Sequence, residues 1–207
     1  MIERIADIQG ILRCFVGSVI KPGDTVLDAT AGRGRDTLFL AQCVGETGRV
    51  YACDIQAAAL EQTQVLLDDH HLSDRVVLLE LDHARIGEKI KEPLRAAMFN
   101  LGYLPGGDRR IVTHGQSTVA ALANSLNMLE RGGIVTVTLY RGHTGAQEEE
   151  AAVCSFLRSL SPRQYAVLTG IYPNLGPNTP YWAVVQKNGG GQTDEGKTPD
   201  QNPRAHR

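Results

Sequence analysis

The sequence contains no apolar run that approaches the roughly 18 residues a helix needs to cross a bilayer. Its first 20 residues also lack the continuous apolar core of a signal peptide, because their hydrophobic residues recur with helical spacing. These residues are Ile5, Ile8, Leu12, Phe15 and Val19. We therefore expect an attached N-terminal helix over residues 1–20, no membrane partner, and a location in the cytoplasm. The apolar face of this helix would pack on its own sheet or on a second subunit, which leaves a homodimer open.

The sequence also lacks the cysteine and histidine spacings of metal sites. Its four cysteines form no Cys-x-x-Cys pair and are scattered through apolar segments, and its six histidines are scattered as well. We expect reduced core thiols and no metal. Neither sign of charge dominates, because the formal net charge is −2 and the pI is near 6.3. Any site for RNA must therefore be a local basic patch.

Large hydrophobic residues are missing from the end of the chain. Residues 188–207 are polar and rich in glycine, so they cannot bury enough apolar surface to offset the entropy lost on ordering, and we expect a disordered tail. The full chain of 207 residues is long enough for one medium domain with its own core. We predict a single domain over residues 1–187.

Strand-like runs alternate with helical ones along this domain. Five strands are expected at residues 25–29, 49–53, 75–80, 95–100 and 133–140, with helical patterns between them, as at 55–69 and 117–130. This order predicts an α/β fold with a parallel sheet and helices on both faces. A sixth helix should begin near Thr144, where Thr144 and Gln147 have the spacing of a capping box. Two further strands, 165–172 and 181–187, should form an antiparallel hairpin at one sheet edge.

The glycine-rich stretch 27–36, LDATAGRGRD, follows the first strand and predicts a site for a nucleotide-like ligand. Asp54, which follows the second strand, suits a ribose in either a dinucleotide or S-adenosylmethionine. The dinucleotide pattern G-x-G-x-x-G fails, because Thr37 stands at its third glycine position. Asp28 would repel a pyrophosphate but would attract the ammonium and sulfonium of S-adenosylmethionine. The residues therefore favour S-adenosylmethionine as the cofactor.

Candidate cofactor-binding residues lie where successive strands end, because ligands of such sheets bind outside the carboxyl ends of the strands. Asp82, just beyond the third strand, is placed to accept a hydrogen bond from the adenine amino group. The candidates are Asp28, Thr30, Gly32, Gly34, Asp36, Thr37, Asp54, Ile55, Gln56, Asp82, His83 and Asn100.

Several strings carry a resemblance to a known family. Residues 24–187 resemble the class I methyltransferases, which have a Rossmann-like, seven-stranded, mostly parallel sheet with a C-terminal antiparallel hairpin. The strings DATAGRGRDTLFLA, FNLGYLPGGD, LYRGHTGAQEEE and NLGPNTP are similar to those of small bacterial methyltransferases long labelled putative rRNA methylases. The resemblance implies methylation of the aminomethyl nitrogen of 5-aminomethyl-2-thiouridine at the wobble position of tRNA. The sequence departs from the family pattern at Arg33, Arg35, Thr144 and Ala146.

The string NLGY at residues 100–103 resembles the [DN]-P-P-[YF] signature of amino-methyltransferases. Amine methylation needs a neutral nitrogen whose N–H groups are held by acceptors. The Asn100 side-chain oxygen and the Leu101 carbonyl are candidates for these acceptors, and the Tyr103 ring for stacking on the base or facing the cationic methyl. His143 or His83 would take the proton of the amine, or solvent would do so before docking.

Arginines after three strands predict a basic rim for the anticodon stem-loop of tRNA. They are Arg33, Arg35, Arg109, Arg110 and Arg141. Base recognition would draw on residues around the last hairpin, by stacking and edge hydrogen bonds, unless the aromatic ones pack on the sheet. These are Tyr172, Asn174, Asn178 and Tyr181.

Other functions remain open on the residues alone. A methyltransferase could act on an rRNA base or on a small-molecule amine, and two rivals from other classes are a dinucleotide-dependent oxidoreductase and a non-catalytic RNA-binding module. Methylation of a pyrimidine carbon is disfavoured, because no cysteine follows the fourth or fifth strand to act as nucleophile.

Overall fold

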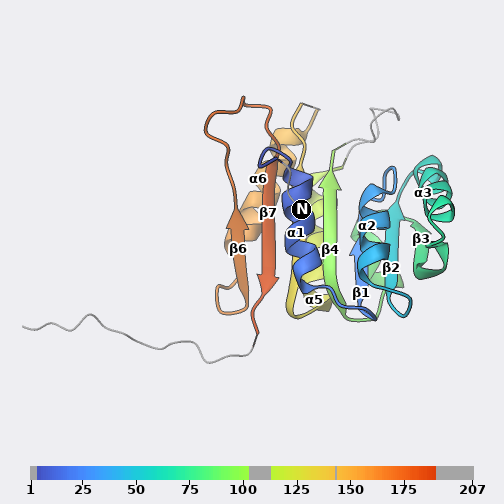
Figure 1. Ribbon diagram of the computed structural model, residues 1–207. Helices are drawn as coiled ribbons and strands as arrows, with labels where there is room; N and C mark the ends of the chain where they lie inside the picture. The colour runs from blue at the N-terminus through green and yellow to red at the C-terminus, as the bar shows by residue number, and fades with distance from the viewer. Residues whose placement is uncertain (1–3, 103–112, 143, 190–207) are drawn as a thin grey trace, which may run out of the picture.

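The alternating segments form one seven-stranded sheet in the computed structural model, which describes residues 4–102, 113–142 and 144–189. Five neighbouring strands are parallel, in the order β3 (Val76–Glu80), β2 (Arg49–Asp54), β1 (Thr25–Asp28), β4 (Leu94–Leu101) and β5 (Leu129–Leu139). Antiparallel β7 (Tyr181–Lys187) pairs with β5, and β6 (Tyr165–Thr169) forms the edge beyond it (Figure 1). The predicted parallel sheet with a C-terminal antiparallel hairpin is confirmed.

Helices cover both faces of the sheet, as predicted. One face carries α1 (Ile8–Val19), α2 (Arg35–Cys43) and α3 (Ala57–Asp69), which contribute to one core cluster, while Leu60 of α3 packs in a smaller cluster with Ala31 and Ala52. The other carries α4 (Ile86–Lys89), α5 (Gly115–Met128) and α6 (Ala146–Ser159), which share a second cluster. Two short 3-10 helices, η1 (Ser73–Arg75) and η2 (His83–Arg85), flank β3.

The central strand β4 shows why both faces must be covered. Met98 packs into the cluster of α1 and α2, whereas its neighbour Phe99 packs into the cluster of α5 and α6. Side chains of a strand alternate between the two faces, so a continuous apolar run buries both. The carboxyl ends of β1 and β4 therefore emerge side by side from a packed centre.

The N-terminal helix is shorter than predicted. It begins at Ile8, where the Asp7 side chain accepts a hydrogen bond from the Gly10 backbone N–H at 3.0 Å and caps the helix. Ile5 precedes this cap and is 77% exposed, so its apolar character does not belong to the helical face. Ile8, Leu12 and Val16 are buried against the sheet of the same chain. This face is therefore not a surface for a second subunit.

The start of α6 also differs from prediction. Its N-cap is Gly145, with a positive φ of 85°, so Thr144 precedes the cap and the predicted capping box with Gln147 does not exist. Within the acidic run that follows, Glu149 is buried and accepts hydrogen bonds from the hydroxyls of Thr113 at 2.7 Å and Thr118 at 2.6 Å. A buried carboxylate satisfied by two hydroxyls joins α6 to α5.

The remaining expectations are met unevenly. All four cysteines are free thiols, but only Cys53 is buried, and Cys14 is exposed, so the prediction of four core thiols is wrong.

Asn188, placed in the predicted tail, is held to the sheet by its backbone N–H, which donates to the Gln164 carbonyl at 2.8 Å. The rest of that tail, 190–207, lies outside the described residues. Of the helices that the structure describes, none has the length and apolar character needed to span a bilayer.

Candidate functional site

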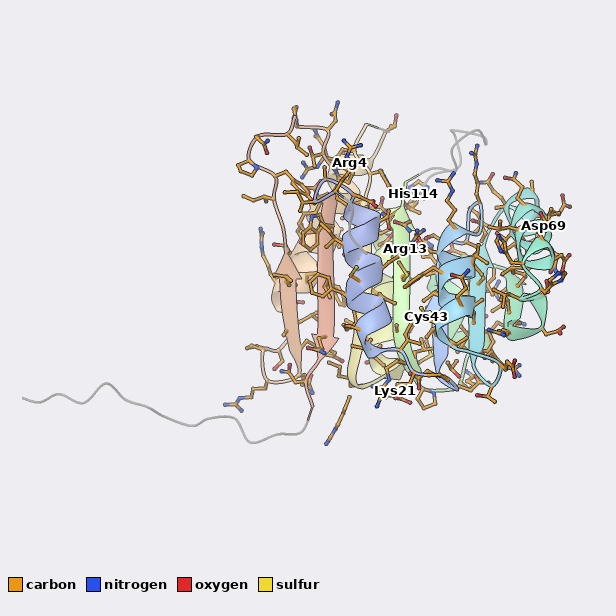
Figure 2. All side chains as sticks on the ribbon, viewed as in Figure 1. Arg4, Arg13, Lys21, Cys43, Asp69 and His114 are labelled. Atoms are coloured by element: carbon orange, nitrogen blue, oxygen red, sulfur yellow. The ribbon has the colours of Figure 1, made fainter. Side chains whose placement is uncertain are left out.

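A cavity of about 900 Å³ opens at the carboxyl ends of the parallel strands. It lies at the switch in strand order. β2 and β3 extend the sheet on one side of β1, whereas β4 and β5 extend it on the other side. Figure 2 shows His114 at this edge of the sheet, whereas Lys21 lies at the opposite edge. The lining residues come from the start of the chain at α1 and from the segments around the carboxyl ends of β1, β2, β3, β4 and β5, so parts of the chain that are far apart in sequence meet here.

The loop between β1 and α2 forms the floor of the cavity. Gly32 and Gly34 both have positive φ angles, 54° and 76°, which L side chains rarely adopt. The Gly32 backbone N–H donates to Asp54 Oδ2 at 2.9 Å, and the Gln56 backbone N–H donates to Asp54 Oδ1 at 2.9 Å. The loops after β1 and β2 are thus joined through one carboxylate. Asp54, Ile55 and Gln56 all line the cavity.

Asp28 does not line the cavity, in contrast to the sequence prediction. It is completely buried beneath the loop, where Oδ1 accepts from the Thr30 N–H at 3.2 Å and Oδ2 from the Thr37 hydroxyl at 2.6 Å. Burial, reinforced by the nearby Asp36, raises the pKa of Asp28 to about 7. Thr37 and Gly34 likewise support the loop without lining the cavity. Asp28, whose charge favoured a cationic ligand in the sequence analysis, therefore stabilises the loop through hydrogen bonds beneath it and does not face the cavity.

The segment after β3 supplies a second wall. Asp82 lines the cavity and caps η2, since its Oδ1 accepts from the Ala84 N–H at 2.8 Å. His83 packs edge-on against Phe99, with ring centroids 6.2 Å apart. Burial lowers the pKa of His83, so the imidazole is neutral near pH 7. Its Nε2 is buried and has no hydrogen-bond partner among the described residues.

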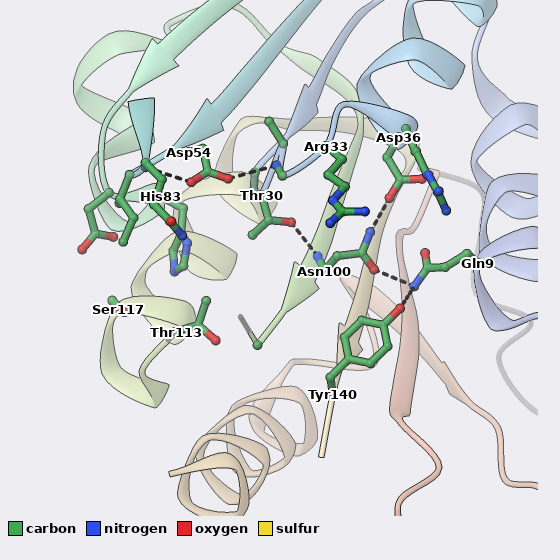
Figure 3. A pocket seen from close by; sticks show the side chains of 18 of the residues that line it. Gln9, Thr30, Arg33, Asp36, Asp54, His83, Asn100, Thr113, Ser117 and Tyr140 are labelled. Atoms are coloured by element: carbon green, nitrogen blue, oxygen red, sulfur yellow. Dashed lines mark hydrogen bonds between the residues drawn. The ribbon is translucent and has the colours of Figure 1, made fainter. Parts of the chain in front are cut away.

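Asn100, at the end of β4, is held by its backbone and by both ends of its carboxamide (Figure 3). Its backbone N–H donates to the Thr30 hydroxyl at 2.7 Å, and its Nδ2 donates to Asp36 Oδ2. Asp36 Oδ1 in turn accepts from Arg13 Nε at 2.7 Å. Gln9 Nε2 donates to Asn100 Oδ1 at 2.6 Å. The Asn100 amide thus has a defined polarity, with its oxygen directed toward α1.

The Leu101 carbonyl, predicted to accept an amine proton, accepts from the Tyr140 backbone N–H at 3.0 Å. It belongs to the pairing of β4 with the end of β5. Sequence reasoning also missed several lining residues: Asp7, Gln9, Arg13, Thr113, His114, Ser117 and Tyr140. The helical period of α1 predicted which residues it buries, but no local pattern marks Gln9 or Arg13 as reaching the cavity.

The predicted basic rim is present in part. Arg33, Arg35 and Arg141 line the cavity. Arg141 is engaged within the chain: its Nε donates to Glu150 at 2.6 Å and its Nη1 to the Pro177 carbonyl at 3.2 Å. The predicted site residues Tyr103, Arg109, Arg110 and His143 lie outside the described residues.

The predicted base-recognition residues around the last hairpin do not line the cavity. Tyr181 packs against the apolar core, and burial raises the pKa of its hydroxyl. The Tyr172 hydroxyl donates to the Ile5 carbonyl, and its ring packs against the cluster of α1. Asn178 is exposed. Packing of the two aromatic residues on the sheet, left open by the sequence, is what the structure shows.

No cluster of three or more histidine, cysteine, aspartate or glutamate side chains with the geometry of a metal site occurs among the described residues.

Comparison with known proteins agrees with this geometry. Residues 50–186 match the protein family described as "Putative rRNA methylase". A chloroplastic tRNA (mnm(5)s(2)U34)-methyltransferase of Arabidopsis thaliana is 43% identical over 148 residues. The match covers 67% of this chain and 54% of that relative, so the chain spans about half the length of the curated protein.

Two solved structures are similar over nearly their whole length. A putative rRNA-methylase from Clostridium thermocellum is 39% identical, with a TM-score of 0.85, and the match covers 86% of this chain and 96% of that one. A putative methyltransferase from Streptococcus mutans, in complex with SAH, is 31% identical, with a TM-score of 0.81 and coverage of 90% and 99%.

Proposed function

Since the chain belongs to the family described as "Putative rRNA methylase", we propose that it is an S-adenosylmethionine-dependent N-methyltransferase that acts on the wobble position of tRNA. The methyl acceptor is the aminomethyl nitrogen of 5-aminomethyl-2-thiouridine. The named activity of the Arabidopsis thaliana relative supports this substrate. A tRNA substrate also fits a cytoplasmic enzyme, with the anticodon stem-loop as its partner.

The observation that carries the proposal is the fixed polarity of Asn100 in the cavity wall. Its Nδ2 is committed to Asp36 and its Oδ1 receives Gln9, so Oδ1 is an acceptor and has one lone pair left. Amine methylation needs such an acceptor, which orients an N–H of the incoming amine so that the lone pair of the amine nitrogen points at the methyl carbon. Carbon methylation or hydride transfer has no need of it.

The residues present fit S-adenosylmethionine. A volume of about 900 Å³ is enough for a nucleoside-sized cofactor and part of a substrate. Asp54 would hold the ribose hydroxyls, with Ile55 against the adenine ring, while the unpartnered Nε2 of buried His83 offers a hydrogen bond at the same end. When bound, the cofactor would supply a sulfonium methyl group: a neutral amine would form a bond to the methyl carbon while the carbon–sulfur bond breaks, and S-adenosylhomocysteine would leave.

The chain's own groups would orient the amine. Asn100 Oδ1 holds one N–H, and the paired charges of Arg13 and Asp36 keep the carboxamide from rotating. The proton acceptor stays open between His143, which lies outside the described residues, His83, and solvent before docking.

RNA recognition would rest on Arg33 and Arg35 at the rim, with Arg109 and Arg110 in the segment outside the described residues. Arg141 is paired with Glu150, so it positions the loop after β5 and we assign it a smaller direct role in RNA binding. Phosphate contacts of this kind orient a nucleic acid without reading its sequence.

The test is to incubate the purified protein with S-adenosylmethionine and tRNA carrying the unmethylated aminomethyl nucleoside, then to weigh the digested nucleosides. We expect one methyl substitution on that nucleoside. Asn100→Ala should abolish it, whereas Asn127→Ala, which changes an exposed asparagine on α5, should not.

The family description favours one second candidate, an rRNA base. The same assay with undermodified ribosomal RNA separates the two. Methylation of rRNA with unchanged tRNA would replace the proposed substrate, and absence of S-adenosylhomocysteine binding by calorimetry would contradict the cofactor itself.

A further inference from the structure

We infer that Gln9, on α1, is a positioning residue that fixes the acceptor oxygen of Asn100 for the methyl-accepting amine. The inference rests on the proposed function and deepens it. Gln9 lies outside residues 50–186, the part of the chain that matches the family. It is brought to the cavity by the fold alone, because 91 residues separate it from Asn100 along the chain.

Three oxygens surround the Gln9 amide nitrogen. Nε2 lies 2.6 Å from Asn100 Oδ1 and 3.2 Å from the Tyr140 hydroxyl oxygen (Figure 3). It also lies 3.1 Å from the Thr138 hydroxyl oxygen. An amide nitrogen has only two hydrogens, and the two hydroxyls can donate as well as accept. Asn100 Oδ1 can only accept, so it alone decides which end of the Gln9 amide must face it.

The orientation of Asn100 follows from both of its neighbours. Rotating its carboxamide by half a turn would place Nδ2 against the Gln9 donor and Oδ1 against the carboxylate of Asp36. The contact with Asp36 would then be repulsive, and the contact with Gln9 would be repulsive as long as Gln9 keeps its donor end toward Asn100. Asp36 holds one end and Gln9 holds the other, so the free lone pair of Oδ1 has a fixed direction before any substrate arrives.

Anchoring of α1 does not explain this glutamine. Ile8, Leu12 and Val16 already bury the helix against the sheet. Moreover, the Gln9 Oε1 atom is buried and has no hydrogen-bond partner among the described residues, which costs stability. A side chain selected only to attach the helix would not keep an unpaired buried oxygen. The arrangement thus keeps the Nε2 donor of Gln9 hydrogen-bonded to Asn100 and leaves the Oε1 acceptor of Gln9 without a partner among the described residues.

The direct test is the NMR signal of the Asn100 side-chain amide, assigned by its loss in the Asn100→Asp spectrum. In Gln9→Met, which keeps the length of the side chain and removes the donor, this signal should shift and lose protection from exchange. Gln64→Met is the matched control, because Gln64 on α3 donates to Asp68 at 2.9 Å away from the cavity. An unchanged Asn100 signal in Gln9→Met would overturn the inference, whether or not the protein methylates tRNA.

Kinetics provide the second readout. Gln9→Met should lower kcat about 10- to 100-fold, the loss typical of a misplaced reacting group, with a melting temperature no lower than that of wild type and unchanged affinity for S-adenosylhomocysteine. In an Asn100→Ala background, S-adenosylhomocysteine affinity should also be insensitive to Gln9→Met, and any residual kcat should not fall further. Equal losses in both backgrounds would show that Gln9 acts independently of Asn100. If Gln9→Met fails to fold, Gln9→Ala serves in its place. Wild-type protein that leaves tRNA unmethylated would contradict the proposed function and leave the NMR result standing.

Discussion

The buried carboxylate of Asp28 should make the stability of the ligand-free protein depend on pH. Asp28 is completely buried, and its pKa is raised from 3.8 to about 7, chiefly by burial and then by Asp36. The folded state therefore keeps a proton on Asp28 up to neutral pH, whereas the unfolded chain releases it near pH 4. Between these values the folded state binds more protons, so the free energy of unfolding falls as pH rises.

The magnitude follows from the size of the shift. A change of about 3 pKa units at about 1.36 kcal/mol each gives about 4 kcal/mol. This contribution is present at about pH 4 and is lost by about pH 7. Asp28→Asn keeps the shape of the side chain and an oxygen for the Thr30 N–H, and the Thr37 hydroxyl can turn to accept from the new amide. The free energy of unfolding of Asp28→Asn should therefore lack the pH dependence that Asp28 contributes, while the fold stays unchanged.

Urea unfolding of both proteins at several pH values between 4.5 and 7.5 measures the effect. The difference in the free energy of unfolding, wild type minus Asp28→Asn, should decrease steadily across this range. Asp69→Asn, which changes an exposed acid at the end of α3, is the control and should follow wild type. Parallel curves for wild type and Asp28→Asn would refute the reasoning.

Three further variants test the supports of the site. Glu149→Ala should lower the free energy of unfolding by about 2–4 kcal/mol, because the Thr113 and Thr118 hydroxyls lose their acceptor, and Glu149→Gln should lose less than half as much in the same urea titration. Gly170→Ala would bring a methyl group within 1.9 Å of the Trp182 ring, so we expect the free energy of unfolding to fall by about 1–3 kcal/mol. The fluorescence of Trp182, the chain's single tryptophan, measures this unfolding. In Gly34→Ala, the new Cβ would stand on a backbone with a φ of +76° and lie 3.0 Å from Thr63. We expect S-adenosylhomocysteine binding, measured by calorimetry, to weaken about tenfold, and unchanged affinity would show that the loop tolerates a side chain there.

The alternation of strands and helices along the chain and the edge of the sheet that holds the cavity were predictable from the sequence, because both follow from local patterns. Alternating strand and helix periods specify a parallel sheet, and parallel strands present their carboxyl ends at one edge. Thr30, Asp54, Asp82 and Asn100 follow successive strands and therefore meet there.

The orientation of individual side chains was not predictable. A carboxylate at the end of a strand can face a ligand or lie beneath the loop, and Asp28 takes the second course because Thr30 and Thr37 satisfy it there. Tyr181 carries the same strand pattern whether its ring faces RNA or the core. Gln9 offers no local signal, since its partners are far away in the sequence.

The distance along the chain between Gln9 and its partners also concerns how the protein is made. Gln9 leaves the ribosome well before Tyr140, which follows 131 residues later in the chain. Pairings of such long range form slowly and only after the intervening chain is available. A nascent chain that ends before β5 would therefore carry Asn100, Asp36 and Gln9, but it would lack the strand that pairs with β4 and the Tyr140 hydroxyl beside Gln9. The wall that holds the acceptor oxygen would be complete only after β5 has been made.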